Sequence, residues 1–306
     1  MIQNSNESKQ SVSGEIVDIK KYIGVASVNV LALNPNNEKL RKYGWSIPED
    51  APEPTYVTTD SEGKKSARVR FLVQIQELEE KPIVAMDFWI REDVQFNRDK
   101  TKCKIIDKYG RTAFGTKDEV KSRSIPQYSN GPAQISPDYK FCHVGEEELV
   151  SFLMKYLNIT PLTTFSRLKN EFVPTTNPGI LTIDHWDWLM KGKMDELAGY
   201  IAMQPSNRVK VVFGIRNTED NKSYQTFLNG TFLSNGSFVN KVSGEYAQAR
   251  KAIDRWAEYH TNGMTTFSAE PIKEWSVFAT QVTEQSDDLE GTGDMPDFED
   301  DLPFDN

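Results

Sequence analysis

Polar and apolar side chains alternate, with a period of two residues, along several segments of this chain. The segment ARVRFLVQIQ, residues 67–76, places valine, phenylalanine and isoleucine on one face and arginine and glutamine on the other. The segments IVAMDFWIR, residues 83–91, and RVKVVFGIR, residues 208–216, repeat the pattern. Successive side chains of a strand point to opposite faces, so this alternation predicts half-buried strands of an antiparallel sheet.

Further segments extend the predicted sheet. Residues 22–33 form a longer apolar run in which Gly24 permits a kink or bulge. Turn residues in 107–114 and 216–224 predict hairpins, and two Asn-Gly pairs in 228–238 predict two more turns. A last strand is expected at residues 275–282.

Helical patterns interrupt these strands. Residues 145–157 have an apolar stripe and three glutamates in the first turn, where the helix dipole favours negative charge. Residues 184–203 and 243–260 are also helical in pattern. The order of strands, helices and strands predicts a mainly β (β plus α) fold, an OB-type antiparallel β-barrel with a helical insertion at about residues 145–204. Two independent domains are the alternative.

The net charge of −9 is unevenly distributed. Ten acidic residues and no basic residue follow position 283, which leaves 35 acidic and 36 basic residues in residues 1–283. The body is therefore nearly neutral. A block of like charge without a core predicts disorder and an interaction tail. We thus expect a flexible N-terminus at 1–12, a body at 13–283 and a disordered acidic tail at 284–306.

Signatures of catalysis are missing from the sequence, so we expect no enzyme and no cofactor. It contains no P-loop, no GxGxxG and no GxSxG motif. Cys142 and His143 are adjacent and Cys103 is remote, which disfavours a metal site. Asp184 and Asp187 fit a helix cap and a first-turn acid better than an acid/base pair.

The sequence also indicates the cellular compartment. Two cysteines provide no disulfide framework, and a reducing compartment is the simplest interpretation. The polar amino terminus does not resemble a signal peptide, and no apolar run is long enough to span a bilayer. We expect a soluble cytoplasmic protein without membrane contacts, located in the host cytoplasm if it is viral.

Basic and aromatic side chains recur on the polar faces of the predicted strands. Single-stranded nucleic acid requires this mixture, because cations follow the phosphates and flat rings stack on unpaired bases. An OB barrel presents such a face on its second and third strands. The candidate nucleic-acid-binding residues are Arg68, Arg70, Trp89, Arg91, Lys102, Lys104, Lys108, Tyr109, Arg111, Lys210, Arg216, Lys222 and Tyr224.

Among these candidates, Trp89, Tyr109 and Tyr224 are expected to stack on bases. A second interpretation stays open for each position. Lysine and arginine are ordinary on the solvent face of any sheet, and Trp89 would lie in the core if the strand register slipped by one residue.

Two short units repeat at the carboxyl end, DMPDF at 294–298 and DDLPF at 300–304. An acidic tail that ends in Asp-Asp-aliphatic-Pro-Phe resembles the tip of bacterial single-stranded-DNA-binding proteins. Phage replicative single-stranded-DNA-binding proteins share the layout of an OB-fold body with an acidic tail. One difference is that Asp305 and Asn306 follow Phe304, whereas the bacterial tip ends in phenylalanine.

The resemblance implies that the tail docks on replication and recombination proteins. Leu302, Pro303 and Phe304 would supply the apolar contact, and Asp300 and Asp301 the charge. The extra residues after Phe304 favour a phage-type protein with its own partners. A tethered polyanion would also compete with DNA for a basic groove. The alternative is a tail that only confers solubility.

These observations together predict a non-catalytic, sequence-tolerant single-stranded-DNA-binding protein of DNA replication, recombination and repair. The alternatives are a viral structural or assembly protein with an acidic docking tail, and a nucleic-acid enzyme or its accessory subunit. The choice between DNA and RNA, and self-association on DNA, stay open.

Overall fold

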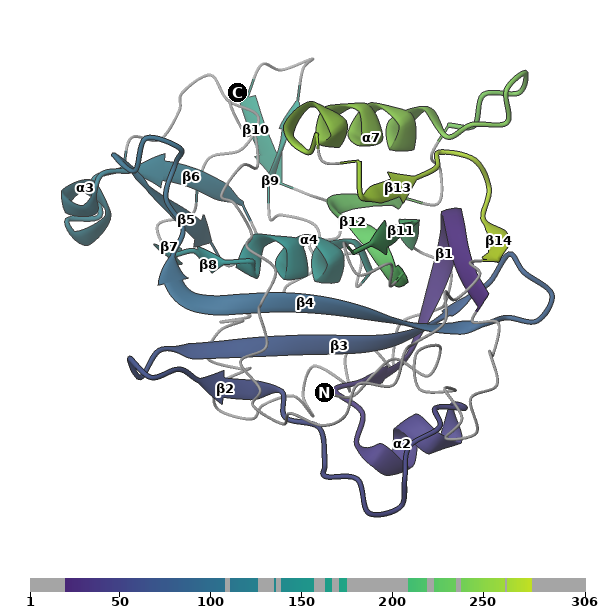
Figure 1. Cartoon of the computed structure of the whole chain (residues 1–306). Helices are drawn as coiled ribbons and strands as arrows, with labels where there is room; N and C mark the ends of the chain where they lie inside the picture. Colours follow the sequence, from purple (N-terminus) through teal and green to yellow (C-terminus); the bar gives the residue numbers. More distant parts are fainter. Residues whose placement is uncertain are drawn as a thin grey trace.

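Antiparallel strands dominate the fold, as expected from the alternating sequence pattern (Figure 1). The structure is a computed structural model that describes residues 20–107, 111–125, 135, 139–156, 163–166, 171–174, 209–218, 223–234, 238–261 and 263–276. The mainly β class is therefore confirmed for this part of the chain.

One large sheet has the strand order β12-β11-β1-β3-β4-β8, and three short strands extend it. β2 pairs with β3, β13 with β11 and β14 with β1. The strands of the sheet are β1 (Lys20–Leu33), β2 (Val57–Thr59), β3 (Lys65–Ile75), β4 (Ile83–Val94), β8 (His143–Val144), β11 (Val209–Asn217), β12 (Ser223–Ser234), β13 (Thr265–Phe267) and β14 (Lys273–Ser276).

The large sheet is curled into a half-barrel, and helix α4 (Glu146–Tyr156) lies on its concave side, between β4 and β12 (Figure 1). Phe152 of this helix is fully buried. Its ring lies 5.1 Å from Phe71, 5.5 Å from Phe88 and 5.3 Å from Phe232, measured between centroids. The apolar faces of strands that are distant in the sequence thus share one core, which the predicted helix completes.

The outer face of the sheet is covered in two places. Helix α7 (Ala247–Tyr259) packs on one side, with Ala249 against Val25 and Val212. On the other side, Leu40 of helix α2 (Asn37–Lys42) and Trp45 cover Leu72 of β3. The polar faces that the sequence predicts are therefore only partly exposed to solvent.

A small lobe with its own apolar core adjoins the end of β4. It comprises β5 (Cys103–Asp107), β6 (Thr112–Gly115), β7 (Tyr139–Phe141), helix α3 (Lys117–Lys121) and the turn at residues 96–102. Its core contains Ile105, Val120, Ile125, Ile135 and Tyr139. β5 pairs with β6, as the predicted hairpin requires, and the residues 108–110 between them lie outside the described part.

The predicted helical insertion at 145–204 is more mixed than expected. Its described part contains α4 and a two-stranded hairpin of β9 (Thr163–Ser166) and β10 (Glu171–Pro174). The predicted helix at 184–203 lies outside the described residues, as do the N-terminus 1–12 and the tail 284–306.

Gly24 is the site of a close backbone approach, whereas the register shift of β1 lies between Val30 and Ala32. Its φ is +124°, and a Cβ atom there would lie 2.7 Å from the Cα of Ile272. The neighbouring Val25 donates its N–H to Glu270 O at 2.8 Å and accepts from the Ile272 N–H at 3.1 Å. A glycine is needed because the segment between β13 and β14 crosses β1 at this point.

The Asn-Gly prediction at residues 229–230 is wrong. Val211 pairs with Phe232 and Phe213 pairs with Phe227, so both flanks of this dipeptide pair with β11. β12 therefore continues through a bulge, with Gly230 at φ +70°, and no hairpin forms there. The second Asn-Gly pair, at residues 235–236, lies outside the described part.

Candidate nucleic-acid interface

A cation lies close to two aromatic rings on the outer face of β3 and β4. Arg68 and Trp89 are direct partners in the β3–β4 ladder. The guanidinium carbon of Arg68 is 5.6 Å from the Trp89 ring centroid and 5.3 Å from that of Tyr56. We call these three residues the Arg68 stack. Two hydrogen bonds hold Tyr56 in place: the Arg68 N–H donates to Tyr56 O at 2.8 Å, and the Tyr56 hydroxyl donates to Pro35 O at 2.6 Å.

The arginines of this site lack an ion-pair partner among the described residues, although the nearby Asp87 charge acts on Arg68. The Nε atoms of Arg68 and Arg91 are buried and have no hydrogen-bond partner among the described residues. Neither arginine forms an ion pair with that part of the chain. Burial, and secondarily the nearby Arg70, lowers the pKa of Arg68, and burial raises the pKa of Tyr56 to about 12. A half-buried cation without a counterion favours an anionic ligand.

Arg70 and Lys104 are not the exposed contacts that the sequence predicts. Arg70 is 5% exposed and forms two bonds to the Asp87 carboxylate, of 2.7 Å and 2.5 Å. Lys104 is 2% exposed and pairs with Glu147 at the start of α4. The expectation of exposure is wrong because other parts of the chain cover both sites. Asn34, for example, accepts from the Arg70 N–H at 2.8 Å.

Two other predicted cations are also engaged within the protein. Lys210 pairs with Glu77 at 3.1 Å and donates to Ser27 Oγ at 2.8 Å. Arg111 pairs with the buried Asp107 at 2.7 Å. Such partners hold these cations in place and reduce their availability for phosphate.

The remaining predictions divide into exposed positions and positions outside the described residues. Lys102 is exposed, and Arg216 is exposed on β11 opposite the half-buried Tyr224. β1 lies between β11 and β3, so this second pair is separate from the Arg68 stack. Outside the described residues lie Lys108, Tyr109, Lys222, Asp300, Asp301, Leu302, Pro303 and Phe304.

Sequence reasoning missed Tyr56, which lies at the end of a proline-rich stretch. The available signal was the β-branched triplet Val57, Thr58 and Thr59 directly after it. These residues form β2, whose pairing with β3 brings Tyr56 to Arg68. The pairing of Lys117 with the Phe96 ring, at 5.4 Å, was also missed.

Within the described ranges, no cluster of three or more His, Cys, Asp or Glu side chains could hold a metal ion. Cys103 and Cys142 are buried and free. No helix of this part of the chain has the length and apolar character needed to cross a membrane.

Comparisons with known proteins identify no relative. No protein-family model, no curated protein and no solved structure matches this chain.

Proposed function

We propose that this protein binds single-stranded DNA without catalysis and with little sequence preference, in DNA replication, recombination and repair. The strand order supports an OB-type body. The five long strands run β12-β11-β1-β3-β4, and α4 follows the third of them along the chain. An OB barrel is a partly open five-stranded Greek key that binds oligonucleotides on strands 2 and 3 and on the loop between strands 1 and 2.

The Arg68 stack is the observation that carries the proposal. In an OB-type assignment β3 and β4 are strands 2 and 3, and Tyr56 belongs to the loop between strands 1 and 2. Arg68 and Trp89 therefore lie where such a fold binds nucleic acid. Arginine without a counterion suits phosphate, and the Trp89 and Tyr56 rings suit stacking on bases, which contributes about 1–3 kcal/mol per base.

The acidic tail adds partner recruitment to this proposal. Its resemblance to the bacterial tip assigns Asp300, Asp301, Leu302, Pro303 and Phe304 to docking on replication and recombination proteins. In the absence of long DNA, the same polyanion competes for the basic surface of the body.

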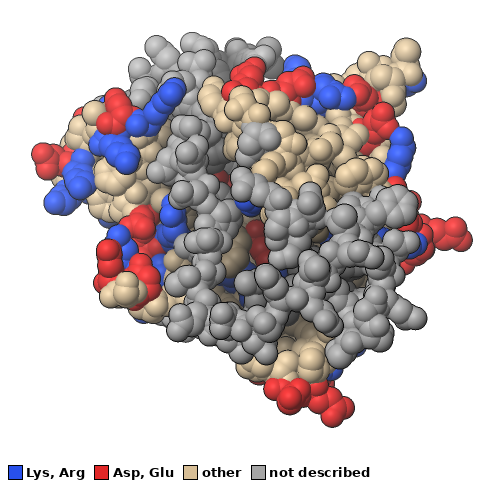
Figure 2. Space-filling model, viewed as in Figure 1, with Lys and Arg blue, Asp and Glu red and all other residues tan. Residues whose placement is uncertain are grey.

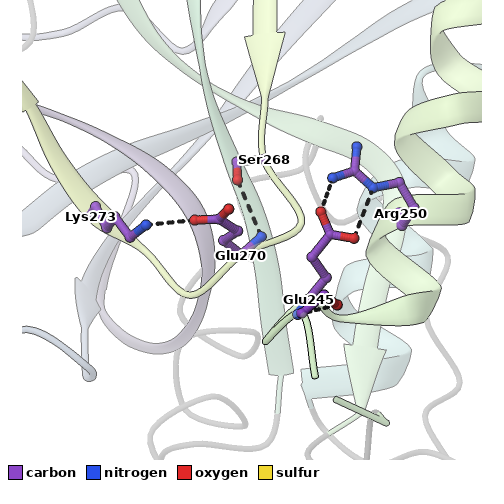
Figure 3. Close-up of polar contacts among 6 residues, drawn as sticks. Glu245, Arg250, Ser268, Glu270 and Lys273 are labelled. Atoms are coloured by element: carbon purple, nitrogen blue, oxygen red, sulfur yellow. Dashed lines mark hydrogen bonds and ion pairs between the residues drawn. The ribbon is translucent and has the colours of Figure 1, made fainter. Parts of the chain in front are cut away.

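A viral structural or assembly protein is the second candidate, and one exposed apolar feature favours it. In the finger (Phe238–Tyr246), Phe238 is 65% and Val242 98% exposed. The finger is ordered at its tip, because Asn240 Oδ1 accepts from the Val242 N–H at 2.9 Å. At its base Glu245 pairs with Arg250 of α7 (Figure 3). An exposed and fixed apolar tip is typical of a protein-docking contact.

Fluorescence-anisotropy titration of a labelled oligo-dT, with a duplex as control and at two salt concentrations, tests the proposal. We expect a strong preference for the single strand, with an affinity that falls as salt rises. Absence of binding, even after removal of residues 284–306, would contradict it and favour the assembly protein.

A further inference from the structure

The positive charge of the body is concentrated in one short segment. Residues 96–125 contain nine Lys/Arg and four Asp/Glu, a net charge of +5. The other residues up to 283 contain 27 Lys/Arg and 31 Asp/Glu, a net charge of −4. The near-neutral body thus consists of a basic segment, residues 96–125, and a mildly acidic remainder. The described part of the basic segment belongs to the small lobe.

Part of the positive charge of the small lobe is exposed and forms no ion pair with the described carboxylates, whereas Lys104 and Arg111 are paired. Figure 2 shows Lys and Arg side chains over α3 and β6, at the left of the molecule, with Asp and Glu side chains among them. Five exposed basic side chains of the small lobe form no ion pair with any described residue. They are Arg98, Lys100, Lys102, Lys117 and Lys121. Elsewhere exposed lysines such as Lys20, Lys64 and Lys273 do pair with carboxylates.

Two acidic side chains of the lobe, Asp99 and Glu119, are held in local hydrogen bonds, and a third, Asp118, is exposed on α3. Asp99 accepts from Thr101 Oγ1 at 2.6 Å, and Glu119 accepts from the Thr116 N–H at 2.8 Å in a capping box. These bonds lower the pKa of both carboxyl groups, so both stay ionised, Asp99 in a turn and Glu119 at the start of α3. The lysines around them remain available to an external anion.

Aromatic rings accompany the cations on this lobe as well. Lys117 lies 5.4 Å from the Phe96 ring centroid, and Arg123 lies 4.8 Å from that of Tyr139. Phe96 follows Trp89 by seven residues along β4 and its continuation, a span of at most roughly 23 Å for an extended chain. A single strand of several nucleotides is long enough to contact both places.

We infer that the small lobe is a second contact for the same single strand. The lobe binds the phosphates of the part of the strand that extends beyond the Arg68 stack. This inference rests on the proposed function and specifies the ligand as a strand long enough to reach from β4 to α3. The stack then anchors bases, and the lobe supplies most of the salt-dependent affinity.

The test compares two full-length variants that each remove four positive charges. The lobe variant is K100Q/K102Q/K117Q/K121Q. The control variant, K39Q/K42Q/K241Q/K251Q, changes four exposed lysines on α2, the finger and α7. Each is titrated with a short and a long labelled oligo-dT at several salt concentrations, after circular dichroism has established that it is folded.

We expect the lobe variant to lose about tenfold or more in affinity for the long oligonucleotide at low salt, with a salt slope smaller by up to about 2.8. The short oligonucleotide should bind both variants alike. Equal binding of the long oligonucleotide by both variants, while Trp89→Ala weakens it, would overturn this inference and leave the proposed function intact. Failure of the wild type to bind any single strand would overturn both.

Discussion

Arg70 and Asp87 face each other across β3 and β4 and form a two-bond ion pair, at 2.7 Å and 2.5 Å. Arg68 lies two residues away on the same strand face and has no such partner among the described residues. Two arginines that look equivalent in the sequence therefore differ in role. Arg70 belongs to the internal structure of the sheet, and Arg68 is the one available to a ligand.

Asp87→Ala should destabilise the fold strongly. It leaves the Arg70 guanidinium buried without its main counterion, and breaking a buried pair in this way costs roughly 3 kcal/mol. Urea unfolding measures the loss. The matched variant Arg70→Met/Asp87→Ala should recover much of the stability, because no charge is then left unpaired. A loss below about 0.5 kcal/mol in the single variant would contradict a structural role for the pair.

Trp89→Ala should weaken binding of oligo-dT by about 1–3 kcal/mol, since it removes one ring of the stack. Trp89→Phe keeps a flat ring and should retain most of the affinity. Anisotropy titrations of the two variants, together with their unfolding curves, separate lost contacts from lost stability. Equal affinity of the alanine variant and the wild type would show that Trp89 does not stack on bases.

Stability should depend on Tyr56 at high pH. Burial raises its pKa to about 12 in the folded protein, against about 10 in an unfolded chain. The folded state thus holds this proton more tightly, so its contribution is fully present below about pH 10 and is lost as pH rises through about 12. Tyr56→Phe has no such proton.

The measurement for Tyr56 is urea unfolding of wild type and Tyr56→Phe at a series of pH values. As pH rises from about 10 to about 12, the free energy of unfolding of the wild type should fall relative to that of Tyr56→Phe. A difference that stays constant with pH would contradict the shifted pKa. Other tyrosines are present in both proteins and cancel in the comparison.

Gly145→Ala should disturb the approach of α4 to β4. Gly145 has φ +80°, and a Cβ atom there would collide with the Trp89 carbonyl oxygen. Strain and collision together should cost about 3 kcal/mol or more. Gly244 is the control, because its φ is +71° and nothing lies within 4 Å of its Cβ position. Gly244→Ala should cost only about 1 kcal/mol, by the same unfolding assay.

Deletion of residues 284–306 should tighten binding of oligo-dT, because it removes a tethered competitor for the basic surface. The gain should be largest at low salt, where charges are least screened. Titrations of full-length and truncated protein over a range of salt concentrations check this. If full-length and truncated protein bind with the same affinity at every salt concentration, the tail does not compete with DNA. Partner docking is then its only proposed role.

The alternating pattern predicted β3, β4 and β11, and the apolar stripe at residues 145–157 predicted the helix inside the sheet. Val69 and Phe71 are buried and Arg68 faces outward, as the period of two requires. The pattern does not reveal what lies on the outer face. Leu72 was the one apolar residue among the outward positions of β3, and it is covered by Leu40 and Trp45.

The candidate site was predictable only in part, because its residues meet through pairings that are distant in the sequence. Arg68 and Trp89 were proposed from their strands, and their direct opposition confirms that they share a face. Arg70 and Lys104 could not be separated from them, because their partners Asp87 and Glu147 become neighbours only after folding. Tyr56 was missed for the same reason.

The central position of β1 has a consequence for how the chain reaches this structure. β1 pairs with β11 and with β14, so Ile23 lies opposite Lys273, at the far end of the described sequence. Contacts between such distant residues make folding slow, since a very long loop must close before they form. During synthesis β1 must remain unpaired along one edge until β11 and β14 emerge from the ribosome. A nascent chain therefore exposes one edge of β1 until β11 has been made, and unpaired strand edges of this kind are prone to aggregation.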